Sequence, residues 1–114
     1  SGTLFASHKM PLKMYLAAFT YSRLKDLGAE IAVLERLAFE PGAPFILKRI
    51  LANAWEARAK GTRDPAGHRE AMGRAIMIWR QVWLTSAAAE ERRWVAIKCG
   101  RIGLDPRRFE KPEK

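Results

Sequence analysis

Only three side chains in this sequence are of the types that bind metals through nitrogen or sulfur, or attack as thiolates: His8, His68 and Cys99. A zinc site needs several such ligands converging on one point, and these three are widely separated without paired spacing. Cys99 lies near Lys98 and Arg101, cations that can lower a thiol pKa, but no histidine base is close in sequence. Glu-x-x-His spacing is absent as well. The sequence predicts no enzyme, no metal site and no cofactor.

The charge of the chain indicates a polyanionic partner. Its 114 residues carry 21 Lys and Arg against 12 Asp and Glu, a formal net charge of +9. Such an excess favours nucleic acid first and an anionic membrane surface second, although a basic protein without such a partner also fits. One cysteine excludes an internal disulfide and predicts a cytoplasmic protein. The longest apolar run, residues 75–79, is too short to cross a bilayer, so no membrane span is expected.

Two groups of side chains are candidates for binding nucleic acid, duplex DNA in particular. Arg and Asn read base edges, while Lys and Arg neutralise phosphates. The first group shares one predicted helix: Lys48, Arg49, Asn53 and Lys60. The second group belongs to the stretch from residue 92 onward, which has a local charge of +5: Arg92, Arg93, Arg101, Arg107 and Arg108. A solvated helix face and a solubilising tail are the alternatives.

The elements that would position these side chains are all helical. Hydrophobic periodicity predicts an all-α fold, a small orthogonal or bundle-like domain with possible dimerisation. About five helices are expected, over residues 11–28, 29–38, 44–60, 65–84 and 87–99. The last two could instead form one long bent rod. We expect residues 1–104 to be a single domain and residues 105–114 an extended basic tail.

Three local signals set the expected helix boundaries. Two prolines flanking a glycine break the chain within residues 40–44. Asp64 is the expected N-cap of the next helix, because Pro65 suits the first helical position. Gly100 is the expected stop of the last helix.

The helix expected over residues 65–84 is apolar nearly all round, so it must lie centrally in the domain or between subunits. Four of its side chains recur at helical spacing: Met72, Ile76, Trp79 and Trp83. A helical aromatic stripe normally belongs to the core. The alternative is a partner surface, because Trp and Met are frequent interface anchors. With few helices to cover this one, we expect these four side chains to form a homodimer interface.

The first 18 residues read SGTLFASHKMPLKMYLAA. This stretch resembles the junction between the zinc ribbon and the next helix in zinc-ribbon transposases of bacterial insertion sequences. In that family a helix-turn-helix follows, and residues 23–28 match its pattern loosely. The four ribbon ligands and the three-carboxylate catalytic domain of the family are not found in this sequence. The resemblance therefore implies kinship with a DNA-binding family, and no catalytic residue is carried over.

The sequence favours a small basic helical protein that binds nucleic acid, related to a transposase but without its catalytic domain. The alternative is a helical module that binds another protein or dimerises through its Trp/Met face. Salt-dependent binding to duplex DNA would support the first, and concentration-dependent mass would support the second.

Overall fold

The computed structural model describes residues 27–111, and within this part of the chain every regular element is helical, as predicted. Four α-helices are followed by a 3-10 helix: α3 (Leu27–Leu37), α4 (Phe45–Lys60), α5 (Pro65–Thr85), α6 (Ala89–Arg101) and η1 (Pro106–Glu110). The first expected helix lies almost wholly outside the described residues. The transposase-like stretch, residues 1–18, lies entirely outside them.

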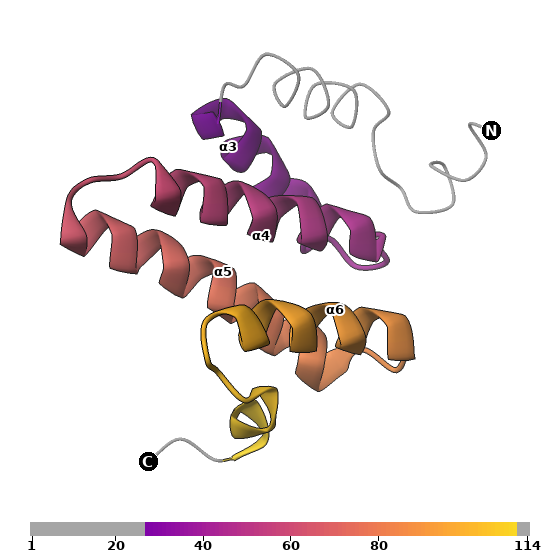
Figure 1. Cartoon of the computed structure of the whole chain (residues 1–114). Helices are drawn as coiled ribbons and strands as arrows, with labels where there is room; N and C mark the ends of the chain where they lie inside the picture. The colour runs from indigo at the N-terminus through magenta and orange to yellow at the C-terminus, as the bar shows by residue number, and fades with distance from the viewer. Residues whose placement is uncertain (1–26, 112–114) are drawn as a thin grey trace.

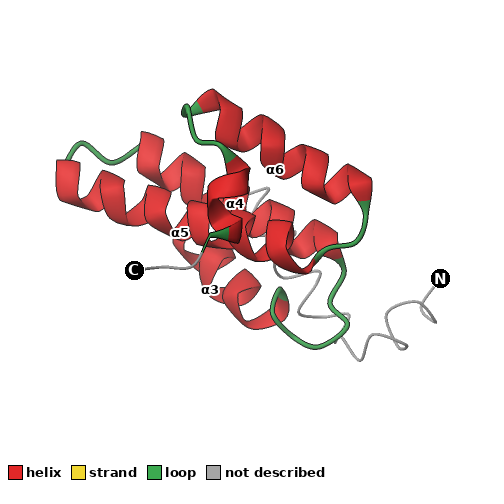
Figure 2. Ribbon diagram, turned by 90° about the horizontal axis from the view of Figure 1, so that it is seen from below, coloured by secondary structure: helices red, strands yellow, loops and turns green. Residues whose placement is uncertain are grey.

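Successive helices pack against one another in chain order (Figure 1). α4 and α5 form an antiparallel hairpin, and α6 returns antiparallel to α5, so that α4 and α6 run in the same direction. Figure 2 shows α3 and α6 on opposite sides of this hairpin. The molecule therefore has two separate flanks, one bordered by α3 and one by α6.

α5 is the central helix of the described residues and contacts α4, α6 and η1. Trp79 is 0% exposed and Val82 is also buried, while Met72, Ile76 and Trp83 are half-buried against the same core. Trp79 therefore belongs to the core, the usual role of such a stripe, while a homodimer interface that includes the partly exposed Met72, Ile76 and Trp83 stays a prediction. Trp79 in particular is enclosed within one chain, so no partner can contact its ring.

The helix starts follow the local chemistry of the sequence. Asp64 caps α5 as predicted, because its carboxylate accepts the backbone N–H of Gly67 at 3.0 Å, with Pro65 at the first helical position. α5 and α6 are two helices and not one bent rod. Ser86 adopts an extended conformation between them, accepts the N–H of Ala88 at 3.2 Å and hydrogen-bonds the Glu91 carboxylate.

The end of α6 differs from the prediction. Gly100 is helical, and α6 ends one residue later, at Arg101. Two residues beyond that end, Gly103 adopts a φ of 73°, which favours glycine. The N–H of Leu104 donates to Cys99 O at 2.9 Å and that of Gly103 donates to Gly100 O at 3.2 Å. This pair of bonds is a Schellman motif, which satisfies the last carbonyls of the helix.

The sequence predicts an extended tail from residue 105 onward. Residues 106–110 instead form the short helix η1. Asp105 caps this short helix by accepting the N–H of Arg107 at 3.0 Å. Phe109 packs against the core, and the Trp83 indole N–H donates to the Glu110 carboxylate at 2.7 Å. Residues 106–110 contact α5, and local composition does not reveal this contact.

Candidate nucleic-acid interface

α4 and α6 are tied together by two side-chain contacts. The rings of Phe45 and Trp94 meet edge to face, with centroids 5.3 Å apart. Farther along, the Lys98 ammonium donates to the Glu56 carboxylate at 2.7 Å. Both members of this ion pair are largely buried, so it is screened less than a surface pair. The two helices that carry most of the predicted binding residues are therefore neighbours.

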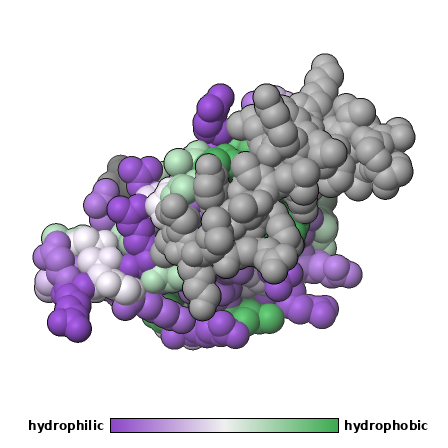
Figure 3. Space-filling view, turned by 90° about the horizontal axis from the view of Figure 1, so that it is seen from above, coloured by the Kyte–Doolittle hydropathy of each residue, from purple (hydrophilic) through white to green (hydrophobic). Residues whose placement is uncertain are grey.

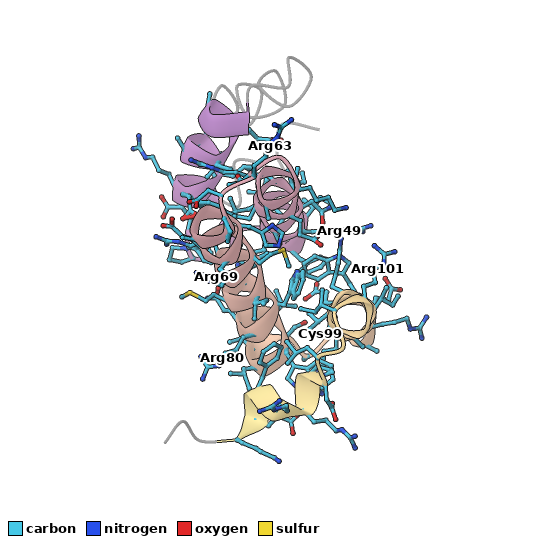
Figure 4. All side chains as sticks on the ribbon, turned by 60° about the vertical axis from the view of Figure 1, so that its left-hand side comes forward. Arg49, Arg63, Arg69, Arg80, Cys99 and Arg101 are labelled. Carbon is cyan, nitrogen blue, oxygen red and sulfur yellow. The ribbon has the colours of Figure 1, made fainter. Side chains whose placement is uncertain are left out.

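Exposed cations lie within about one turn of these two contacts: Arg49 is four positions after Phe45, Lys60 four after Glu56 and Arg101 three after Lys98. On α4, residues spaced by four and eleven positions share a side of the helix, and on α6 so do residues spaced by eight. We call this surface the α4–α6 face and define it by its exposed polar members: Arg49, Asn53, Lys60, Arg93 and Arg101. Figure 4 shows Arg49 and Arg101, one from each helix, pointing to the same side of the molecule.

Charge is unevenly distributed along the α4–α6 face. Both helices end in basic residues, Lys60 on α4 and Arg101 on α6, whereas the first turn of α6 carries Glu90 and Glu91. A groove of about 470 Å³ lies between the two helix starts, where the acidic side chains already offset the positive ends of the helix dipoles. The negative charge of Glu56 on α4 is compensated by Lys98. The cations at the two helix ends therefore have no acidic neighbour in this groove, whereas Arg49 lines it together with Glu90 and Glu91.

Lys48 does not belong to the α4–α6 face, contrary to the prediction. Its ammonium group turns towards the end of α3, donates to Ala38 O at 2.9 Å and lies 5.5 Å from the centroid of the Phe39 ring. Burial lowers the Lys48 pKa, against an opposing effect of the Glu91 carboxylate. Lys48 thus satisfies a carbonyl of the α3 terminus and is not available to a phosphate.

Three other predicted residues lie away from α4. The Arg92 guanidinium stacks on Trp83, 4.1 Å from the ring centroid, and reaches Glu110 at 3.4 Å. Arg107 pairs with Asp105 at 2.9 Å, and Arg108 is exposed on η1. The second sequence cluster is therefore divided: Arg93 and Arg101 join the α4–α6 face, and the others surround η1.

The groups that could react or ligate are held in structural roles. Cys99 is a buried residue of α6. Its desolvation, together with the nearby negative charge of Asp105, raises the pKa of its thiol to about 11. The thiolate form is thus disfavoured at neutral pH. The His68 ring nitrogen Nδ1 lies 2.8 Å from Ala59 O across the α4–α5 turn. Among residues 27–111, no three His, Cys, Asp or Glu side chains gather as a metal site requires.

The lengths of the helices and of the connector between α3 and α4 bear on a membrane span and on a helix-turn-helix. None of the described helices is both long enough and apolar enough to cross a bilayer. Hydrophilic side chains predominate on the described surface seen from above, with small hydrophobic areas between them (Figure 3). The connector between α3 and α4 spans residues 38–44, longer than the roughly three- to four-residue turn of a helix-turn-helix.

No protein-family model, curated protein or solved structure matches this chain.

Replacing Lys48 by methionine should separate stability from binding. Lys48→Met keeps the length of the side chain but leaves Ala38 O without its donor, so we expect a loss of about 1 kcal/mol in the free energy of unfolding. Because Lys48 lies outside the α4–α6 face, affinity for duplex DNA should stay within about twofold. Urea denaturation and fluorescence anisotropy measure the two effects. A large loss of affinity for duplex DNA in a folded variant would show that Lys48 contributes to binding.

Proposed function

We propose that this protein binds nucleic acid, duplex DNA first, through the exposed cations of the α4–α6 face. The observation that carries the proposal is the exposure of Arg49, Lys60 and Arg101 on two adjoining helices, without a carboxylate partner among the described residues. Cations on adjoining rigid helices neutralise phosphates without first having to be ordered.

Asn53 adds a group that can do more than neutralise charge. It is exposed one turn after Arg49 on the same stripe of α4. An asparagine amide can form paired hydrogen bonds with adenine, while the arginines flanking it hold the helix on the phosphates. The resemblance of residues 1–18 to DNA-binding transposases agrees with this proposal. Contacts of the arginines would set the affinity, and Asn53 would contribute sequence preference.

The test is the salt dependence of binding to a labelled duplex of unrelated sequence, followed by fluorescence anisotropy. If the four cations of the face each contact a phosphate, log K should fall with log salt concentration with a slope of about −3.6. Raising the salt from about 50 to 200 mM would then weaken binding roughly 100-fold. A slope near zero would contradict the proposal.

A matched pair of single substitutions locates the site. Arg49→Ala removes a cation from the face and should reduce the salt slope by about 1. Arg69→Ala removes the same charge from the opposite side of the molecule, where Figure 4 shows its side chain, and should leave the slope unchanged. Equal effects of the two substitutions would mean that net charge alone drives binding. A loss only with Arg107→Ala/Arg108→Ala would assign binding to η1 instead.

A further inference from the structure

The flank bordered by α3 contains a groove unrelated to the α4–α6 face. α3 and α5 both pack against α4. A cavity of about 400 Å³ opens between α3 and α5, and Trp55 of α4 forms one of its walls. Trp55 is held in place by its indole N–H, which donates to the Glu35 carboxylate at 3.1 Å. The guanidinium groups of Arg58 and Arg74 lie 5.5 and 5.7 Å from its ring centroid. The groove therefore has an aromatic wall in a fixed orientation.

Large apolar side chains are exposed along this groove. Phe39 is 42% exposed, Met77 66% and Leu84 45%, and together they make up half of the large apolar residues that the described part of the chain exposes. Apolar side chains gathered in one concave site mark a place where another molecule binds, whereas scattered ones need no explanation. Met77 and Leu84 are seven positions apart on α5, so they lie about two helical turns apart along the groove.

The rim of the groove is cationic. Arg74 and Arg80 project from α5 beside the apolar side chains, and neither has a carboxylate within ion-pair distance among residues 27–111. The one acidic residue in the lining, Glu35, accepts the Trp55 N–H. An occupant must therefore combine an apolar stripe with negative charge on its flanks.

We propose that this groove docks an acidic amphipathic helix of another protein. A helix laid in a groove inserts apolar side chains spaced by three, four and seven positions, which fits the two-turn separation of Met77 and Leu84. Glu or Asp residues beside that stripe would pair with Arg74 and Arg80. The surface is Met-containing and partly flexible in side-chain shape, as surfaces that accept helices often are.

Charge excludes the other occupants. Residues 1–26 contain four Lys and Arg against one Asp, so they carry the same sign as the rim. A second copy of this chain, at +9, is repelled for the same reason. A nucleic-acid backbone would complement the arginines but would leave Phe39, Met77 and Leu84 without apolar contacts. An acidic helix alone satisfies both parts of the groove.

The probe is a fluorescein-labelled helical peptide with leucines at positions i, i+4 and i+7 and glutamates on both sides of that stripe. Two control peptides keep its length: one has the same composition with the leucines scattered, and one replaces every glutamate by lysine. We expect the full chain to bind the first peptide and to bind both controls at least about tenfold more weakly.

Two protein variants test the location. Met77→Glu places a like charge in the groove at a solvent-exposed position and should weaken binding of the acidic peptide at least about tenfold. Ile97→Glu alters another exposed apolar residue, on α6 outside the groove, and should change it less than about twofold. Circular dichroism confirms that both remain folded. Equal binding by the two variants, equal binding of the lysine peptide, or no binding by the unaltered chain would overturn the proposal.

The same variants keep this proposal separate from the proposed function. Met77→Glu should retain affinity for duplex DNA, and Arg49→Ala should retain affinity for the acidic peptide, because the two sites lie on opposite flanks. Light scattering completes the test. A dimer formed by the unaltered chain and dissociated by Met77→Glu would show that a second copy occupies the groove, which would also overturn the proposal.

Discussion

Replacing Trp79 by alanine should lower the free energy of unfolding by about 3–5 kcal/mol. The indole is 0% exposed at the centre of α5, and it is the largest fully buried side chain of the described core. Alanine would remove most of its apolar surface and leave a cavity that the surrounding core cannot close fully. A loss of this size is a large fraction of the total stability of a small domain. Urea denaturation followed by far-UV circular dichroism measures it.

Two further substitutions test whether the loss of stability comes from the buried volume of the Trp79 ring. Trp79→Phe keeps most of the ring and removes a buried indole N–H that has no hydrogen-bond partner among the described residues, so it should cost less than about 2 kcal/mol. Met77→Ala, two positions away on the exposed side of α5, should cost no more than about 0.5 kcal/mol. If Trp79→Ala were as mild as Met77→Ala, Trp79 could not be part of the core.

The double charge reversal Arg49→Glu/Arg101→Glu should weaken binding to duplex DNA on the order of 100-fold at low salt. Each substitution removes a phosphate contact and puts a repelling carboxylate in its place, one on each helix of the α4–α6 face. Both arginines are exposed and outside the ion pairs of the described residues, so stability should change little. Anisotropy titrations at matched ionic strength check the affinity.

The charge-matched control is Arg69→Glu/Arg80→Glu. It changes the net charge by the same amount but on the other side of the molecule, where Figure 4 shows both side chains. We expect it to weaken binding by no more than about threefold, through long-range repulsion that salt removes. Equal losses in the two double variants would show that binding has no defined surface on this protein.

Helix positions could be predicted closely because they depend on local chemistry. The pair Asp64 and Pro65 marks the start of α5 in the sequence, and the structure has its helix there. The end of α6 was predicted wrongly at Gly100, because a helical glycine and a left-handed one look the same in a sequence. The left-handed backbone of Gly103 lets the N–H groups of Gly103 and Leu104 donate to Gly100 O and Cys99 O while Leu104 packs on the core.

The candidate site could be predicted only in part. Periodicity placed one group of polar side chains on α4, and local charge marked the basic stretch from residue 92 onward, but neither could show that α4 and α6 are neighbours. The contacts that join them, Lys98 with Glu56 and Phe45 with Trp94, are pairings that no local pattern signals. The same lack of tertiary information explains Lys48, a cation that periodicity places on α4 but that turns inward to Ala38 O.

The Lys98–Glu56 pair also bears on how the chain reaches this fold. Most helix packing joins consecutive elements, which close short loops and form quickly in folding. The contact between α4 and α6 instead joins residues 42 positions apart in the sequence and needs α5 already in place between them. We expect it to form late, after the α4–α5 hairpin. Nascent chains would then acquire the proposed DNA-binding surface only when folding is complete.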